Sequence, residues 1–317
     1  MRVGLDIGGT KTDAVAVAAS GALAGRVRLA TGWGPAGVTQ TVVDAVAALR
    51  REHIGAAHIS SVGVGMPGQV EPGTTRVLHA VNLGVAELDL AAAVGSRLGA
   101  PLRVDNDVKA AALGAHALRG RAHETMAYLN LGTGVAAGVV RDGTLWRGTH
   151  GTAGEVGHIS IDPRGPVCRC GQRGCIEALA GGASIARQWG RPAPLPVVDM
   201  LDAADAGDAA AQRLRAGLMT GVAAAVRILV LTCDVDAVVL GGGVASLGDR
   251  LLGGVREQLT SRAEASAFMR SLRLADRVEL LPQGSVAAAF GAALVGAAGA
   301  ADAQGADHEP EETVAHG

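Results

Sequence analysis

The chain has 317 residues, a formal net charge of −2 and an isoelectric point near 6.5. This length favours two domains with large cores, and the near-neutral charge argues against a basic nucleic-acid-binding domain. The first apolar run has no signal-peptide pattern, and the later apolar runs are short, interrupted by arginine or rich in Gly and Ala. We therefore expect a cytoplasmic protein that neither binds nucleic acid nor crosses a membrane.

Strands and helices alternate in the first third of the chain. Apolar runs predict strands, and apolar residues at helical spacing predict helices. The expected strands are residues 2–7, 12–18, 24–30, 59–66 and 101–107, and the expected helices are residues 38–53, 88–98 and 107–118. The first three strands follow one another directly and predict a β-meander.

The second half of the chain begins with a similar pattern. Residues 125–143 form a strand, a Gly turn and a second strand, and NLGTGVAAGVV resembles DIGGTKTDAVAV near the start. This similarity indicates an internal duplication, although any two hairpins in a Gly-rich chain share some features. A long helix at 208–233, a strand at 235–245, a further helix, a strand at 277–282 and a helix at 285–296 follow. The alternation predicts an α/β fold with mixed sheets, in two related domains that face each other across a cleft.

Three of the four cysteines lie close together after a histidine. The order is His158, nine residues, and then Cys168, Cys170 and Cys175. Three thiolates and one imidazole form a closed tetrahedral donor set for Zn²⁺, so the predicted zinc is structural. The alternative is a chance cluster of free thiols. Cys233 lies in an apolar segment and is expected to be a core thiol.

Two glutamates flank this cluster. Glu155 precedes His158 in the sequence AGEVGH, and Glu177 follows the last of the three cysteines. Carboxylates and imidazoles form hydrogen bonds with hydroxyl groups. A loop held by zinc is therefore expected to present Glu155, His158 and Glu177 to a polyhydroxylated ligand.

A Gly-rich turn with the sequence DIGGTKT follows the first strand. It connects two strands, unlike the P-loop, which opens a helix. Glycines let backbone N–H groups approach phosphate oxygens, and Asp6 is placed to meet Mg²⁺. With NLGTG and LGGG there are three such turns, which predict a site for ATP; a plain hairpin turn is the alternative for the first one alone. The predicted nucleotide-binding residues are Asp6, Gly8, Gly9, Thr10, Lys11, Thr12, Gly132, Thr133, Gly134, Gly241, Gly242 and Gly243.

Asp107 is the candidate general base. The sequence VDND ends a strand and begins a helix, and strand ends are where α/β proteins place their chemistry. Phosphoryl transfer from a nucleotide to a hydroxyl group requires a residue that accepts the hydroxyl proton. The alternative is that Asp107 only caps the helix.

These motifs resemble those of the ROK (repressor, open reading frame, kinase) family of sugar kinases. DIGGTKT, GMPG, VDND, NLGTG, AGEVGHI, CRCGQRGCIE and VVLGGG occur in the family's order. The resemblance implies a glucokinase-like enzyme with a two-domain, actin-like (ribonuclease H-like) α/β fold and an interdomain cleft. The small domain would comprise residues 1–106 and 286–300, and the larger one, with the zinc loop and a dimerisation surface, residues 107–285. Residues 301–317 are acidic and are expected to be a disordered tail.

The resemblance also implies the reaction. Asp107 would take the proton of the sugar 6-hydroxyl as this group attacks the γ-phosphate of Mg-ATP, and the enzyme would be a homodimer. The residues expected to contact the sugar are Asn82, Asn106, Asp107, Glu155, His158 and Glu177. Lys109 stands where the family usually has Asn, and Val85 and Ala86 replace a common aromatic residue, so the identity of the sugar stays open.

Alternatives remain for the sugar, for the phosphate donor and for catalysis itself. An N-acetylhexosamine kinase acting on GlcNAc or ManNAc differs in the room at the sugar 2-position, which the sequence does not show. Polyphosphate could replace ATP as the donor. A sugar-sensing repressor would carry a winged helix ahead of DIGGTKT, which here begins at Asp6, and a zinc-stapled scaffold without catalysis would not need Asp107 or DIGGTKT.

Overall fold

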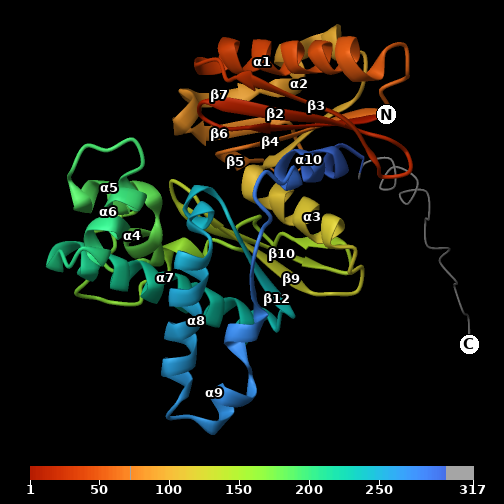
Figure 1. Cartoon of the computed structure of the whole chain (residues 1–317). Helices are drawn as coiled ribbons and strands as arrows, with labels where there is room; N and C mark the ends of the chain where they lie inside the picture. The colour runs from red at the N-terminus through yellow and green to blue at the C-terminus, as the bar shows by residue number, and fades with distance from the viewer. Residues whose placement is uncertain (72, 298–317) are drawn as a thin grey trace, which may run out of the picture. The chain divides into compact units, whose positions relative to one another are not determined.

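The computed structural model describes residues 1–71 and 73–297 (Figure 1). The chain divides into two compact units. Unit 1 comprises Met1–Ala110 together with the chain from Ala288 onward, and unit 2 comprises Ala111–Ala287. The acidic tail expected at 301–317 lies outside the described residues.

Unit 1 is built on a five-stranded mixed sheet with the order β3-β2-β1-β4-β8. The first three strands form the predicted antiparallel meander, and β4 and β8 continue the sheet parallel to β1. The strands are β1 (Arg2–Ile7), β2 (Lys11–Val17), β3 (Leu23–Ala30), β4 (Ser61–Met66) and β8 (Leu102–Asn106). A second, antiparallel sheet contains β5 (Gln69–Val70), β6 (Arg76–Ala80) and β7 (Val85–Asp89).

Two helices of unit 1 show how its core forms. In α1 (Gly34–Leu49), apolar residues at helical spacing are buried in the same core as β1 and β4. Against β1 and β4, α10 (Ala287–Ala297) packs backbone to backbone. A Cβ atom at Gly63 would lie 1.7 Å from the carbonyl oxygen of Ala292, so glycine is required at this contact. The other helical segments are Arg50–Ile54, Val81–Leu83, α2 (Leu90–Val94), Gly95–Leu98 and α3 (Asp107–Arg119), which ends in unit 2.

Unit 2 is built on a sheet with the order β11-β10-β9-β12-β13. The strands are β9 (Met126–Leu131), β10 (Val135–Arg141), β11 (Thr144–Trp146), β12 (Ala237–Gly241) and β13 (Val278–Leu280). The helices are α4 (Ile176–Ala180), α5 (Gly182–Trp189), α6 (Pro196–Asp205), α7 (Ala209–Cys233), α8 (Asp249–Ala263) and α9 (Ala267–Ser271), with short helical turns at Val156–His158, Gly243–Leu247 and Leu274–Arg277.

The two five-stranded sheets share one topology. In each, two antiparallel pairings at one edge are followed by two parallel pairings at the other. The β1–β2 hairpin corresponds in this order to the β9–β10 hairpin. The common order agrees with the internal duplication that the sequence indicates, and the predicted α/β class with mixed sheets is confirmed.

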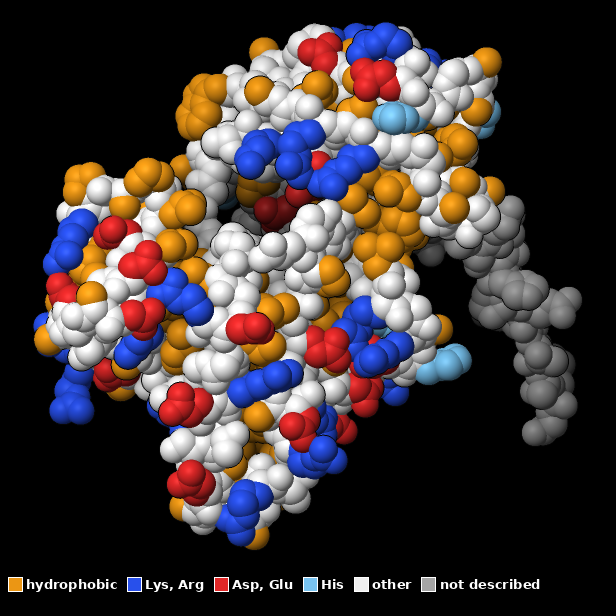
Figure 2. Space-filling model, in the orientation of Figure 1, with side chains coloured by type: hydrophobic (Ala, Val, Ile, Leu, Met, Phe, Trp, Pro, Cys, Tyr) orange, Lys and Arg blue, Asp and Glu red, His pale blue; other side chains and the backbone are white. Residues whose placement is uncertain are grey.

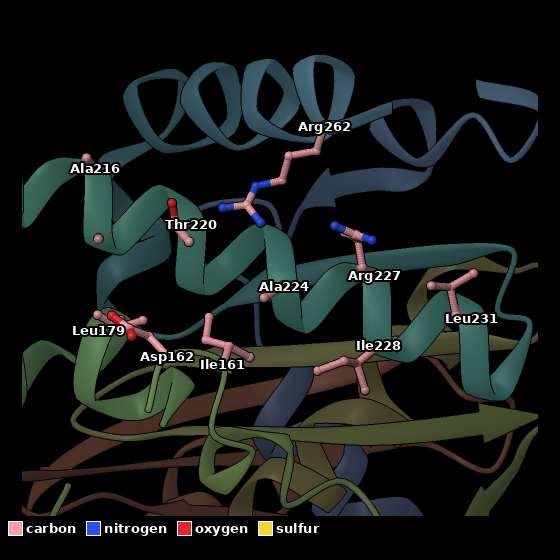
Figure 3. A pocket seen from close by; sticks show the side chains of 11 residues that line it. Ile161, Asp162, Leu179, Ala216, Thr220, Ala224, Arg227, Ile228, Leu231 and Arg262 are labelled. Atoms are coloured by element: carbon pink, nitrogen blue, oxygen red, sulfur yellow. The ribbon is translucent and has the colours of Figure 1, made fainter. Parts of the chain in front are cut away.

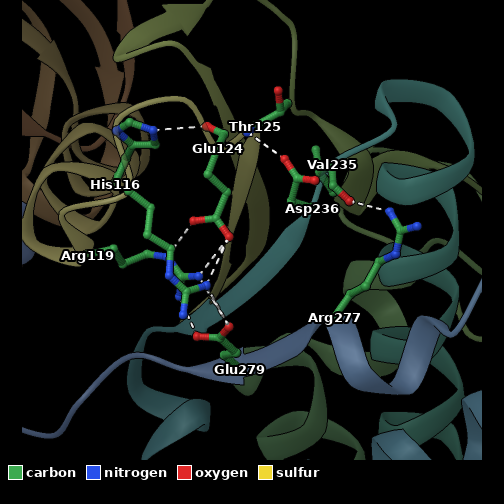
Figure 4. Close-up of polar contacts among 9 residues, drawn as sticks. His116, Arg119, Glu124, Thr125, Val235, Asp236, Arg277 and Glu279 are labelled. Atoms are coloured by element: carbon green, nitrogen blue, oxygen red, sulfur yellow. Dashed lines mark hydrogen bonds and ion pairs between the residues drawn. The ribbon is translucent and has the colours of Figure 1, made fainter.

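Ionic contacts anchor the end of α3 within unit 2 (Figure 4). Arg119 donates hydrogen bonds to the carboxylates of both Glu124 and Glu279, and Nε2 of the buried His116 lies 3.0 Å from the carbonyl oxygen of Glu124. The side chains of Arg119 and Glu124 are only 15% and 10% exposed, so they form a fixed connection between α3 and β13. Elsewhere on unit 2, acidic and basic side chains are interspersed over the surface shown in Figure 2. Exposed pairs such as Arg250 and Asp202 add little to stability.

The long helix α7 is a core element of unit 2. Its length and composition would suffice to cross a membrane, but half of its most apolar stretch is buried inside the protein. It contacts α4, α6 and α8. The expected helix at 88–98 differs from the structure, since β7 runs to Asp89 and α2 ends at Val94, before Gly95 with a positive φ of 55°.

Candidate active site

The DIGGTKT motif forms the tight turn between β1 and β2. The N–H group of Gly8 donates to the carbonyl oxygen of Lys11 across 3.0 Å. Gly9, Thr10 and Lys11 are exposed, as a loop that binds phosphate requires. Thr12 is fully buried, and its hydroxyl lies 2.8 Å from that of Thr31. Thr12 therefore stabilises the turn from its buried side.

Two aspartates lie at the carboxyl ends of strands in unit 1. Asp6 is close to the end of β1, and Asp107 begins α3 directly after β8. Between these strands lies β4, whose Gly65 pairs with Asp6 on one side and with Asp105 on the other. A Cβ atom at Gly65 would lie 3.0 Å from the Cβ of Ala110, so the absence of a side chain lets α3 begin close to the sheet.

Both carboxyl groups hold their protons more tightly than usual. Burial is the main cause that raises the pKa of Asp6 to about 7, and the charges of Asp107 and Asp13 add to it. Burial also raises the pKa of Asp107, although the N–H group of Val108 opposes this change. Raised pKa values of neighbouring acids mark a candidate site for proton transfer or cation binding.

Asn106 caps α3. Its Oδ1 accepts hydrogen bonds from the N–H groups of Val108 and Lys109, at 3.0 and 3.3 Å. Its Nδ2 donates to the carbonyl oxygen of Gly68 in the GMPG segment, at 3.2 Å. The capping role that the sequence left open for Asp107 therefore belongs to its neighbour.

Asn82 lies beside the phosphate turn. It is exposed on the helical turn Val81–Leu83, and a Cβ atom at Gly9 would lie 3.0 Å from its carbonyl oxygen. Asn82, Asn106 and Asp107 thus belong to the same unit as the first Gly-rich turn.

In unit 2, the His/Cys cluster has the geometry of a tetrahedral metal site. The ligand atoms of His158, Cys168, Cys170 and Cys175 all lie within 4.8 Å of one another. The Sγ atoms of Cys170 and Cys175 are 3.7 Å apart, and Cys168 Sγ is 3.9 Å from His158 Nδ1. Ligands at about 2.3 Å around a tetrahedral Zn²⁺ are separated by about 3.8 Å. These four residues therefore fit zinc, and Nδ1 is the ring nitrogen that faces the cluster.

Close backbone contacts hold the loop that carries Glu155. The N–H group of Ala137 on β10 donates to the carbonyl oxygen of Gly154 at 2.7 Å. A Cβ atom at Gly157 would lie 2.0 Å from the carbonyl oxygen of Val135, so the loop lies directly on this strand. Glu155 is exposed at the start of the helical turn Val156–His158. One short turn therefore carries both Glu155 and His158.

Glu177 contacts the second Gly-rich turn. Its Oε2 accepts a hydrogen bond from the N–H group of Val135 at 3.0 Å. A Cβ atom at Gly134 would lie 2.4 Å from the same oxygen, so a side chain there would displace the Glu177 carboxylate. The N–H group of Gly182 donates to the carbonyl oxygen of Gly132 at 2.9 Å. The turn at Gly132–Gly134 is thus held by the segment that follows the metal cluster.

The third Gly-rich turn lies beside the second. Gly241 on β12 pairs with Asn130 on β9, and both turns leave the sheet at this edge. Gly242 has a positive φ of 84°, and a Cβ atom there would lie 2.6 Å from the backbone of Leu131. Gly243 has open space around it. The structure therefore brings together two of the three turns predicted to bind the nucleotide.

A pocket of about 480 Å³ in unit 2 lies apart from these residues. It is bordered by α7, with Arg262 of α8 pointing toward it (Figure 3). Its walls include Leu179, Ile228 and Leu231 but none of the predicted site residues. The candidate site is therefore defined by the turns, the acids and the metal cluster.

Comparison with known proteins agrees with these motifs. A family model described as "ROK family" matches residues 2–297. The chain belongs to the ROK family. Its relatives include a glucokinase from Halalkalibacterium halodurans, 31% identical over 82% of this chain and 86% of the relative. An N-acetylmannosamine kinase from Yersinia pseudotuberculosis is 33% identical over 76% of this chain and 82% of the relative.

A solved ROK structure matches the fold of this ROK protein. The ROK family glucokinase from Streptomyces griseus, in complex with glucose and AMPPNP, is 28% identical and superposes with a TM-score of 0.75. The match covers 94% of this chain and 99% of that one. The expected family and the actin-like α/β fold are thereby confirmed.

Two features of this ROK protein were not assigned from the sequence. GMPG carried the resemblance, but the need for Gly65 beneath α3 appears only when the register of β4 and β8 is known. The capping by Asn106 was equally hidden, because Asn and Asp are both favoured at helix N-termini.

Proposed function

We infer that this ROK protein is an ATP-dependent sugar kinase, and we propose that it phosphorylates the 6-hydroxyl of a hexose. The observation that carries the proposal is the pair of acids, Asp6 and Asp107, at the strand ends beside the exposed turn Gly8–Lys11. Their raised pKa values mark them as chemically active groups. The identity of the relatives supports the class of reaction.

Asp107 is the proposed general base. It accepts the proton of the sugar hydroxyl as the oxygen attacks the γ-phosphate, and base catalysis of this kind contributes about 10²–10⁴-fold. The raised pKa makes the Asp107 carboxylate a stronger base than an ordinary aspartate. Asn106 is the residue that caps α3, although Oδ1 of Asp107 also accepts a hydrogen bond from the N–H group of Val108 at 2.9 Å.

The donor is proposed to be Mg-ATP. Asp6 would hold the cation or its water shell, and the cation would neutralise charge on the phosphates. The turn Gly8–Lys11 supplies backbone N–H groups, a hydroxyl and a cationic side chain to phosphate oxygens. In unit 2, Gly132, Thr133 and Gly134, with Gly241, Gly242 and Gly243, are proposed to bind the remainder of the nucleotide.

Zinc in unit 2 is proposed to be structural. Cys168, Cys170, Cys175 and His158 occupy all four positions, so the metal orders the loop and takes no part in the reaction. Because Nδ1 of His158 faces the cluster, Nε2 remains for a sugar hydroxyl. Glu155 and Glu177 are proposed to accept hydrogen bonds from other hydroxyl groups of the sugar. In unit 1, Asn82 and Asn106 are also proposed to form hydrogen bonds with hydroxyl groups of the sugar.

A kinase for N-acetylhexosamines is the second candidate. The similarity to an N-acetylmannosamine kinase, at 33% identity, favours it specifically. A homodimer and a cytoplasmic location are proposed for either enzyme. The four cysteines, all of them among the described residues, form no disulfide, which suits a reducing compartment.

One experiment tests the reaction and the base together. Glucose, mannose, N-acetylglucosamine and N-acetylmannosamine are each supplied with Mg-ATP, and with polyphosphate in parallel, and the sugar phosphate is quantified. We expect one or more hexoses to be phosphorylated at the 6-position, and Asp107→Ala to lower kcat by about 10²–10⁴-fold. A mutant that kept most of the turnover would exclude Asp107 as the base, and a wild type inactive on all four sugars would refute the function.

A further inference from the structure

Exposed apolar side chains adjoin Asn82 on unit 1. Val81, its neighbour, is 75% exposed, and Trp33 is 72% exposed. These are the two most exposed large hydrophobic side chains among the described residues. An indole with this exposure has no role in the core, and the chain has only three tryptophans in all. Exposed apolar residues that gather around a polar one indicate a surface that binds a ligand.

Trp33 reaches this place by packing on Gly84. A Cβ atom at Gly84 would lie 2.5 Å from Cε2 and 2.6 Å from Nε1 of the indole, so the ring lies on the glycine backbone. Gly84 also has a positive φ of 67°, which disfavours other residues. One side of the indole is thereby supported two residues after Asn82, while most of its surface remains in water.

Hydrogen bonds tie the segment of Trp33 to the phosphate turn. The N–H group of Thr31 donates to the carbonyl oxygen of Thr10 at 3.1 Å, and its hydroxyl lies 2.8 Å from that of Thr12. The N–H group of Gly32 donates to Thr41 Oγ1 on α1 at 2.9 Å. Since Asn82 also lies against Gly9, the segments 9–12, 31–34 and 81–84 adjoin one another, with Gly9, Trp33, Val81 and Asn82 exposed.

This surface has the chemistry that a pyranose ring requires. A hexose carries hydroxyl groups around its edge and C–H groups on its faces. It is therefore bound well by a hydrogen-bonding amide together with a flat apolar side chain. Tryptophan combines a large apolar face with little side-chain entropy to lose on binding. We propose that Trp33, with Val81, is the platform on which the hexose ring stacks while Asn82 binds a hydroxyl. This assignment rests on the proposed sugar kinase function.

Steady-state kinetics of the full chain test the platform. Trp33→Ala and Trp33→Phe are compared with Trp146→Ala, which removes a tryptophan that is 53% exposed in the other unit of the chain. For Trp33→Ala we expect the KM for the hexose to rise about tenfold, equivalent to about 1.4 kcal/mol. The kcat and the KM for Mg-ATP should stay within about twofold of wild type, and Trp33→Phe should recover part of the affinity.

Tryptophan fluorescence gives a second measurement that does not depend on turnover. Adding the hexose that the wild type phosphorylates should change the emission of wild type and Trp146→Ala, and this change should be absent in Trp33→Phe. Circular dichroism should show that all variants fold, because both tryptophans are largely exposed. If the wild type is active and the hexose KM of Trp33→Ala lies within about twofold of the wild-type value, the platform is wrong but the proposed function stands. A wild type that phosphorylates no hexose would overturn the proposed function and the platform with it.

Discussion

Replacing Asp6 by asparagine is expected to stabilise unit 1 while it removes a group needed for Mg-ATP. The folded chain raises the pKa of Asp6 from its usual value of 3.8 to about 7, mainly by burial. Between these values the unfolded chain releases a proton that the folded chain keeps, so stability falls as the pH rises through this range. At 1.36 kcal/mol per pKa unit, the ionised carboxylate costs about 4 kcal/mol above pH 7 and less than half of that at pH 5.

Calorimetry without sugar, nucleotide or divalent cation measures this effect. Asp6→Asn should raise the Tm of unit 1 by on the order of 10 °C at pH 8, and by about a third of that at pH 5. Asp13→Asn is the matched control of opposite sign, since hydrogen bonds from Arg28 and Arg26 outweigh burial and lower the pKa of Asp13. It should destabilise the chain at pH 8. An Asp6→Asn protein no more stable than wild type at pH 8, or a gain that did not shrink at lower pH, would show that burial does not penalise the Asp6 carboxylate.

Three further predictions concern the reaction, the metal and the packing. The kcat/KM for Mg-ATP should fall below about pH 7, because protonation removes the charge of Asp6. The kcat should fall only at lower pH, since bound cation stabilises the Asp6 carboxylate in the complex. A kcat/KM that stayed constant from pH 8 to pH 6 would contradict this. Cys170→Ala should lower bound zinc from about one atom per chain to near zero by elemental analysis and weaken hexose binding, whereas Cys233→Ala should retain both. Gly63→Ala should cost about 1–3 kcal/mol of unfolding free energy, because its Cβ would meet the backbone of α10. Gly253→Ala, with open space on α8, should be neutral or stabilising in the same denaturant titration.

The parts of the fold that the sequence predicted are those with strong local signals. The apolar strands around DIGGTKT and NLGTG form sheets with the same topology, since short apolar runs next to Gly turns leave few alternatives. The spacing of the cysteines and His158 identified a metal site because soft ligands rarely cluster by chance. The cluster's distances in the structure agree with that interpretation.

The missed parts depend on contacts between distant segments. The small sheet of β5, β6 and β7 has a strand of only two residues, which gives no periodic signal. The position of Trp33 depends on Gly84, some fifty residues away along the chain, and a single exposed tryptophan carries no pattern of its own. The raised pKa of Asp6 likewise depends on burial and on the approach of Asp107, which only the folded sheet provides.

The split of unit 1 along the chain has a consequence for synthesis. A ribosome makes the five strands of its main sheet early, then the whole of unit 2, and only afterwards the helix α10 that covers β1 and β4. Unit 2 is continuous in sequence and can therefore fold as the chain emerges, in the usual order for separate domains. The glycine-lined surface of β1 and β4 stays exposed until α10 has been synthesised. The nascent protein therefore passes through a stage in which unit 2 is folded and unit 1 is incomplete.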